Sequence, residues 1–140
     1  MSDAAQSLYN AKTSIDDSAA VAKLLETIDL KKNIANYRVE LQLKKDPKSL
    51  TVNFDIVVAE KNQKTFDEKV RKYAEQILAL VTDAEEVTWV YEVKPEGKKK
   101  QEATVYLNTE GATELLKNDV KSYGESAKGI QTLLDQQKGY

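Results

Sequence analysis

Two runs of strictly alternating apolar residues constrain this chain more than any other feature of its sequence. In residues 37–43, and again in residues 50–58, every second side chain is apolar. Since the side chains of a β-strand point alternately to opposite faces, each run predicts a strand with one apolar and one polar face. The Asp46-Pro47 pair between the runs is typical of a turn. The two runs therefore predict a β-hairpin.

The apolar pattern also favours one register for this hairpin. Folding the runs about the turn places Leu41 opposite Val52 on the apolar face. The same register places Arg38 opposite Asp55 on the polar face. Oppositely charged residues directly across two strands stabilise a sheet by about 0.2–1 kcal/mol, so both faces are consistent with this pairing.

A second hairpin is predicted over residues 87–107, with its turn at Gly97. Pairing its two arms places Trp89, the only tryptophan of the chain, opposite Val105 on an apolar face. An aromatic residue on that face is expected to belong to the core. The sequence thus favours a structural role for Trp89 over an exposed binding platform.

Three helices are expected around these hairpins. Asp16 or Asp17 is a suitable N-cap for a short amphipathic helix, and Thr65-Phe66-Asp67-Glu68 is a capping-box sequence at the start of a second. Apolar residues at alternating spacings of three and four predict a long C-terminal helix over residues 112–137. Gly124 lies inside it, so a bend or break there is an alternative.

These elements predict an α+β fold in the order α-β-β-α-β-β-α. Residues 1–12 lack a repeating apolar pattern and are expected to form a flexible lead-in, followed by a single domain over residues 13–140. Four strands with one apolar face each are expected to form an antiparallel sheet. Helices are then expected to pack on one face of that sheet.

Composition removes several classes of function. The 21 basic and 23 acidic residues are mixed along the whole chain, so no basic stripe is present for a nucleic acid. Histidine and cysteine are both absent, and with them the commonest general base, thiolate nucleophiles and the usual zinc ligands. No cofactor, no metal site and no catalytic residue is predicted.

Paired carboxylates are the remaining candidates for catalysis, at Asp16-Asp17, Asp67-Glu68 and Glu85-Glu86. Each pair lies next to an expected helix end, where acidic residues complement the helix dipole. Caps and solvated turns therefore explain these pairs better than acid–base chemistry.

A candidate interaction surface follows from the strand pattern. The predicted sheet leaves one face uncovered, and the tip of the second hairpin carries three consecutive lysines. Solvation of the tip is the favoured interpretation of the lysines, with an acidic partner or anionic surface as the alternative. The candidate residues are Thr51, Asn53, Thr88, Val90, Thr104, Tyr106, Lys98, Lys99 and Lys100.

Residues 10–93 resemble a known family in several sequence features that follow one another along the chain. These are Asn10 and Thr13 before an Asp-led helix, Leu24-Leu25 within that helix, and the strand at residues 50–54. The chain is similar to a small domain found in extracytoplasmic lipoproteins of Gram-positive bacteria. The same domain is attached to membrane-bound regulatory peptidases of the β-lactam-sensor type. This chain departs from the family at residues 14–17, where an aromatic residue, an aliphatic residue, glycine and aspartate are usual.

The resemblance implies a position outside the membrane and a sensory or interaction role. We therefore expect a non-catalytic extracytoplasmic domain, made as a lipoprotein or a secreted protein, that binds a protein or a cell-envelope component. Contact with the membrane is expected only through a removed lipid anchor or signal segment. Two alternatives are a small-ligand binder or hydrolase that uses carboxylates alone, and a cytosolic adaptor that pairs through a sheet edge.

Overall fold

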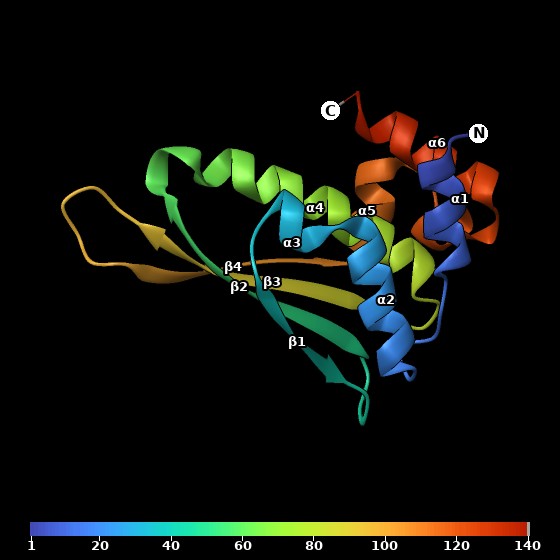
Figure 1. The fold of residues 1–140 in the computed structure, drawn as a ribbon, viewed down its shortest axis with the longest axis horizontal. Coiled ribbons are helices and arrows are strands. Elements are labelled where there is room, and N and C mark those ends of the chain that lie inside the picture. Colours follow the sequence, from blue (N-terminus) through green and yellow to red (C-terminus); the bar gives the residue numbers. More distant parts are fainter. Residues whose placement is uncertain (140) are drawn as a thin grey trace.

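A four-stranded sheet forms the centre of the fold (Figure 1). The computed structural model describes residues 1–139. The strands lie in the order β1-β2-β3-β4, with β1 at Tyr37–Gln42, β2 at Ser49–Ala59, β3 at Glu86–Lys94 and β4 at Gln101–Asn108. β1 and β2 form one antiparallel hairpin and β3 and β4 form another, as expected. The α+β class is confirmed.

The prediction of an all-antiparallel sheet is wrong, because β2 and β3 are parallel. A parallel pair needs a crossover connection long enough to return the chain to the starting edge of the sheet. The short 3₁₀ turn η1 (Glu60–Asn62) and the helix α4 (Gln63–Leu80) provide that crossover. The alternating pattern showed which face of each strand is buried, but it carried no information on how the two hairpins join.

The register of the first hairpin differs from the expected one by two residues. Leu41 pairs with Leu50, and Arg38 pairs with Asn53 instead of Asp55. A shift of two residues leaves every side chain on the same face, so the apolar pattern is satisfied equally well by both registers. In the second hairpin, Trp89 pairs with Val105 as predicted.

The N-terminal residues differ from the expected flexible lead-in, because they form a helix, α1 (Asp3–Asn10). The hydroxyl of Ser2 caps this helix by accepting a hydrogen bond from the Ala5 N–H at 3.2 Å. Ala5 and Leu8 are buried, and α1 packs against the C-terminal helix α6. Two buried side chains are too few to produce a repeating pattern in the sequence, which explains why the helix was missed.

The next helices begin close to their expected caps. α2 (Ser18–Ile28) starts after Asp17, whose carboxylate accepts from the Ala20 N–H at 3.0 Å, and the short α3 (Leu30–Asn33) follows. α4 starts at Gln63, two residues before the predicted start, and no side chain caps its first turn. The capping-box prediction is therefore wrong in position, because the preceding 3₁₀ turn continues directly into the helix.

The long C-terminal helix is broken into three pieces. These are α5 (Thr109–Leu116), the 3₁₀ segment η2 (Val120–Glu125) and α6 (Ala127–Gln137). The hydroxyl of Ser126 accepts from the Gly129 N–H at 2.9 Å and so caps α6 after the break. The expected continuous helix is wrong and the alternative of a break near Gly124 is confirmed.

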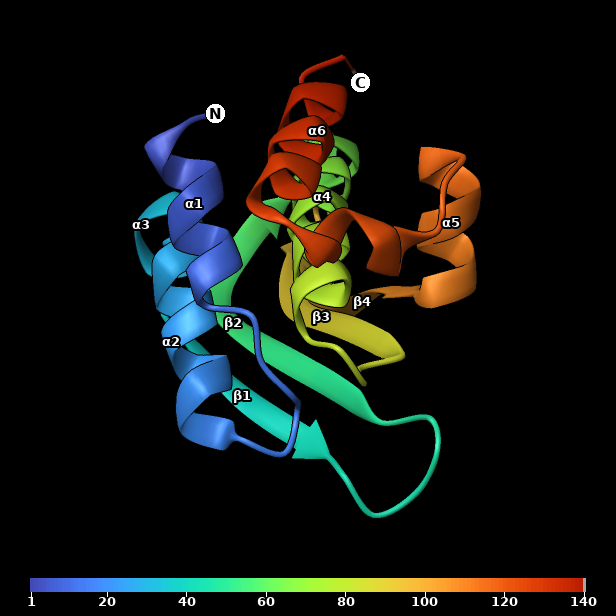
Figure 2. The same ribbon diagram turned by 90° about the vertical axis from the view of Figure 1, so that its right-hand side faces the viewer.

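The helices lie on one side of the sheet (Figure 2), and the hydrophobic core lies between the two layers. Trp89 is fully buried there and stacks on Phe54, with ring centroids 5.5 Å apart and ring planes 10° apart. The structural role predicted for Trp89 is confirmed. Within residues 1–139, the opposite side of the sheet carries no helix, and it holds most of the candidate residues.

Candidate functional site

The uncovered side of the sheet, here called the outer face, brings the six predicted strand residues together in two rows. One row runs Thr51, Thr88 and Tyr106 across β2, β3 and β4, and the other runs Asn53, Val90 and Thr104. Both rows exist only because β2 and β3 are parallel neighbours. Sequence reasoning placed each residue on the correct face but did not predict these rows.

Each row continues onto β1 with a charged residue that sequence reasoning did not include. Glu40 pairs with Thr51, and Arg38 pairs with Asn53. The carboxylate of Glu40 accepts a hydrogen bond from the Asn53 side-chain amide at 3.4 Å. The outer face is therefore a polar surface with hydroxyl, amide, carboxylate and guanidinium groups on adjacent strands.

Tyr106 is the most exposed aromatic side chain on this face, with 59% of its surface accessible. Thr104 beside it is exposed, and Val90 on the neighbouring strand is half-buried. Tyrosine has a large apolar ring and a polar hydroxyl, and such side chains are enriched where proteins bind one another. Tyr106 is the outer-face residue best suited to anchor a partner.

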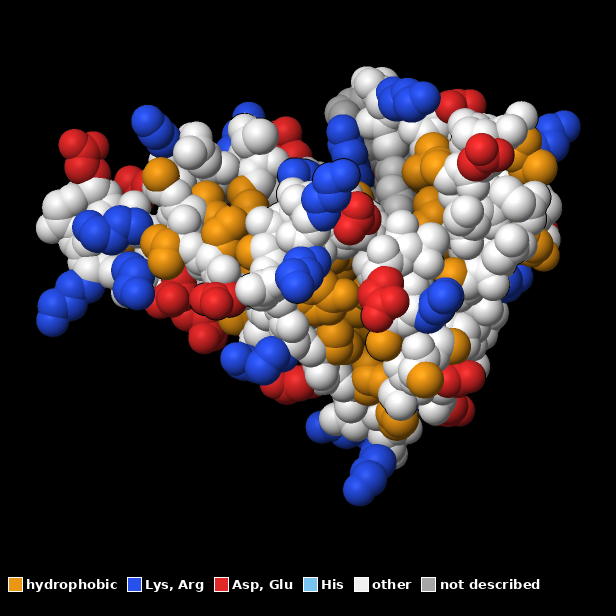
Figure 3. All heavy atoms as spheres, viewed as in Figure 1, with side chains coloured by type: hydrophobic (Ala, Val, Ile, Leu, Met, Phe, Trp, Pro, Cys, Tyr) orange, Lys and Arg blue, Asp and Glu red, His pale blue; other side chains and the backbone are white. Residues whose placement is uncertain are grey.

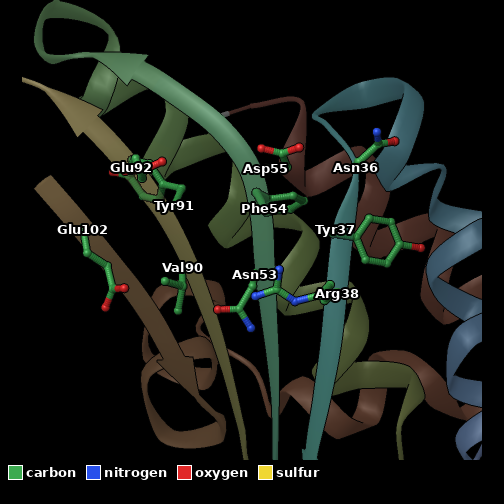
Figure 4. Close-up of a pocket in the computed structure, with 10 residues that line it drawn as sticks. All are labelled: Asn36, Tyr37, Arg38, Asn53, Phe54, Asp55, Val90, Tyr91, Glu92 and Glu102. Carbon is green, nitrogen blue, oxygen red and sulfur yellow. The ribbon is translucent and has the colours of Figure 1, made fainter. Parts of the chain in front are cut away.

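A hollow of about 390 Å³ opens on the outer face where the pairing of β2 with β3 is interrupted between Asn53 and Val57 (Figure 4). Its charged lining residues are Arg38, Asp55, Glu92 and Glu102. Figure 4 shows Arg38 beside Asn53, with Val90 and Glu102 on the next strands. The hollow offers hydrogen-bond donors and acceptors of both charges to a small polar group.

The three lysines lie apart from the two rows, at the tip of the second hairpin. Lys98, Lys99 and Lys100 are exposed, and Gly97 adopts the left-handed φ of 71° that the turn requires. The ammonium of Lys100 lies 3.9 Å from the carboxylate of Glu92, which links the tip to the rim of the hollow. An ion pair this exposed contributes little to stability.

Each of the three carboxylate pairs has one member with a structural partner. Asp17 caps α2, and Asp67 accepts a hydrogen bond from the Tyr91 hydroxyl at 2.6 Å. Burial and the bond to Asp67 raise the pKa of Tyr91 to about 12. In the third pair, Glu85 accepts a hydrogen bond from the Thr109 hydroxyl at 3.0 Å.

The half-buried lysine Lys121 was not predicted as a structural residue. The ammonium of Lys121 donates hydrogen bonds to the carbonyl oxygens of Leu78, Val81 and Ala84, at 2.7, 2.8 and 2.7 Å. Burial lowers the pKa of Lys121 to about 8, while nearby carboxylates act in the opposite direction. Its partners are backbone atoms at the end of α4 and beyond, so no side-chain pattern in the sequence indicates it.

The segment where the chain departs from the family pattern is tied to Asp83. The two carboxylate oxygens of Asp83 accept from the Ile15 N–H at 2.7 Å and from the Ser14 hydroxyl at 2.8 Å. Burial alone would raise the pKa of Asp83, but these hydrogen bonds outweigh it and hold the pKa below its usual value. The Lys48 ammonium lies 3.8 Å from Asp83, so this loop is part of a local structural network.

Searches for a membrane span and for a metal centre gave no candidate in residues 1–139. No helix there combines the length and the apolar character needed to cross a bilayer. Over the same residues, no group of three or more acidic side chains is arranged to hold a metal ion.

Comparison with protein families identified a match over most of the chain. A protein-family model described as a domain of unknown function, DUF4825, matches residues 8–106, which is more than half of the chain. The match runs from the end of α1 into β4, so the whole of α5, η2 and α6 lies beyond it. No curated protein and no solved structure matches the chain.

Proposed function

The chain belongs to the DUF4825 family, a domain of unknown function, and on that premise we propose that it is a non-catalytic binding domain whose outer face contacts a protein partner. The observation that carries this proposal is the helix-free outer face with Tyr106 exposed on it. The polar residues of the two rows give a partner several hydrogen-bonding groups in a fixed arrangement. Interfaces commonly combine such an aromatic anchor with a polar surround.

We also propose that the domain works outside the membrane, as part of a lipoprotein or a secreted protein, with a protein or a cell-envelope component as its partner. The similarity of residues 10–93 to domains of extracytoplasmic lipoproteins supports this location. Expression of the tagged full-length gene in its own host, followed by fractionation, tests it. Recovery of the tag in the cytosolic fraction alone would contradict it.

Binding through the outer face is tested by comparing three versions of the protein as baits for an envelope extract. The versions are wild type, Tyr106→Glu and the matched control Leu115→Glu, which changes another exposed apolar residue, on α5. Wild type and the control are expected to retain a partner that uses the outer face. The amount of this partner retained by Tyr106→Glu is expected to be at least tenfold lower.

Each outcome of that comparison is informative. Equal retention by all three baits would reject the outer face as the binding surface. Failure of the wild-type bait to retain any protein above a blank resin would reject binding to a component of that extract. A purified candidate from the experiment then allows the affinity difference to be measured directly.

A small-ligand role is the second candidate, and the hollow beside Arg38 favours it. Its guanidinium and the carboxylates of Glu92 and Glu102 line one space of about 390 Å³. Thermal unfolding of wild type and Arg38→Gln, each with a panel of small polar acids and amines, tests this role. A ligand that raises the melting temperature of wild type alone would support it, and no rise with any panel member would reject it for those compounds.

A further inference from the structure

β2 continues past the point where β1 can pair with it. The β1 pairing starts with Tyr37 opposite Phe54, and the N–H of Asp55 donates to the carbonyl oxygen of Asn36 at 2.8 Å. Residues 56–59 continue β2, and within the described part of the chain Val57, Val58 and Ala59 pair only with β3. The β1 side of this half of β2 is therefore an open strand edge, of the kind that pairs with another chain.

A groove of about 350 Å³ lies between this open edge and the N-terminal half of α4. Residues 56–59 of β2 form one wall, and Asn62, Thr65, Phe66 and Lys69 form the other. The lining is mainly apolar, and the side chain of Val57 is 46% exposed. Figure 3 shows hydrophobic side chains at the surface below the N-terminal half of α4, among basic side chains.

We propose that this groove binds an extended peptide segment of a partner protein, which adds to the open edge of β2 as an antiparallel strand. An extended backbone presents N–H and C=O groups in the spacing that a strand edge offers, and strand addition is an established mode of peptide recognition. Four residues of β2 are open, which corresponds to a segment about 13 Å long. A segment that continues the line of β1 runs antiparallel to β2, as β1 does.

The groove selects the side chains of that segment. Alternate residues of an added strand face the same side, so apolar residues two positions apart contact Ile56, Val58 and Phe66. Among the residues that the structure describes, Lys69 is the only charged one that lines the groove. Its ammonium donates to the Asn33 carbonyl oxygen at 2.7 Å, and an ammonium has three N–H groups. In the antiparallel direction, the C-terminal end of the segment approaches Asn33, so an aspartate or glutamate there is expected to pair with Lys69.

The probe for this site is a library of hexapeptides that are acetylated at the N-terminus and amidated at the C-terminus. It is screened against wild type, Lys69→Glu and Thr65→Trp, in which the larger side chain fills the groove. Wild type is expected to select alternating apolar residues and an acidic residue near the C-terminal end. Lys69→Glu is expected to bind these peptides with at least tenfold lower affinity, and to select lysine or arginine at the position of the acidic residue. Thr65→Trp is expected to select none of the peptides that wild type selects.

Two controls separate this site from the proposed outer-face function. Lys98→Glu removes an exposed lysine away from the groove, and Tyr106→Glu changes the outer face, so both are expected to bind the selected peptides as wild type does. The best peptide is then added to isotope-labelled wild type. Its amide shifts are expected at residues 56–59 and 62–69, which tests the location without any substitution.

Several results would overturn the proposal. One is that wild type selects peptides without alternating apolar residues. Another is that Thr65→Trp selects the same peptides as wild type. A third is that the amide shifts lie outside residues 56–59 and 62–69. Sedimentation of wild type alone supplies a further test. A dimer that Thr65→Trp abolishes would show that a second copy of this chain occupies the edge, in place of a partner peptide.

Discussion

Gly124 packs so closely against the backbone of Ala79 that a Cβ atom on Gly124 would overlap the Ala79 carbonyl oxygen. This contact joins η2 to α4. The neighbouring atom belongs to the backbone of a helix, so it has little freedom to move aside. The break in the C-terminal helix is thus accompanied by a contact that only glycine allows.

Gly124→Ala is therefore expected to lower the free energy of unfolding by about 3 kcal/mol or more, because overpacking against backbone is relieved only by moving a whole element. Urea unfolding measures the change. Gly139→Ala is the matched control, since a Cβ there meets its nearest atom, the Gln136 carbonyl oxygen, at 3.4 Å. Equal stability of both variants would show that η2 and α4 are not in contact in solution.

Lys121→Met is expected to destabilise the fold by about 2–3 kcal/mol, because three backbone carbonyls lose their charged donor. Lys128→Met, which changes an exposed lysine of α6, is expected to have little effect. Chemical unfolding at pH 7 compares the two. A loss no larger than that of the control would show that water replaces the ammonium without cost.

The same lysine predicts a dependence on pH. Its pKa is about 8 in the folded protein, whereas the ordinary value is 10.5. Between pH 8 and pH 10.5, the unfolded chain therefore binds more protons than the folded protein does. The contribution of Lys121 to stability is therefore expected to be smallest below pH 8, where the ammonium is charged in both states, and to rise as pH increases from 8 to 10.5. The difference in unfolding free energy between wild type and Lys121→Met, measured across this range, isolates it. A difference that stays constant or shrinks would contradict the prediction.

Tyr91 predicts the opposite trend at higher pH. Its pKa is raised to about 12, above the ordinary value of 10, so the folded protein holds the phenolic proton longer than the unfolded chain. Its contribution is fully present below pH 10 and is expected to decrease as pH rises from 10 to 12. The stability difference between wild type and Tyr91→Phe should shrink over that interval. Tyr106→Phe, which removes the hydroxyl of an exposed tyrosine, serves as the comparison.

Leu8→Ala tests whether α1 is an integral part of the fold. Truncation of a buried leucine is expected to cost about 2–5 kcal/mol, whereas Gln6→Ala on the exposed side of the same helix should cost under about 0.5 kcal/mol. Thermal unfolding of the two variants distinguishes these values. Similar melting temperatures would favour the flexible lead-in that the sequence predicted.

The faces of the strands could be predicted from sequence because alternation has a period of two. Trp89 was assigned to the core and Tyr106 to the outer face on that basis, and both assignments are confirmed. Register is a finer property. In the second hairpin, the pairing predicted about the turn at Gly97 is the observed one. In the first hairpin, the observed register is shifted by two residues, and such a shift leaves the faces unchanged.

The parallel pairing of β2 with β3 could not be predicted, because a helix of the length of α4 can return the chain in either direction. The rows of the candidate site depend on this pairing. The sequence therefore predicted which residues lie on the outer face, but not which of them lie beside one another across the strands. Lys121 and Asp83 were missed for a related reason. Their partners lie far away in sequence and include backbone groups, which carry no residue-type signal.

The parallel seam between β2 and β3 also has a kinetic consequence. Each hairpin closes a short loop, but the seam forms only when the chain has closed a loop that includes all of α4, and non-local pairings of this kind slow folding. Refolding from denaturant should therefore protect the amide hydrogens within the hairpins before those shared by β2 and β3. The seam that aligns the two rows of the outer face is then the last part of the sheet to form, and the outer face exists only from that moment.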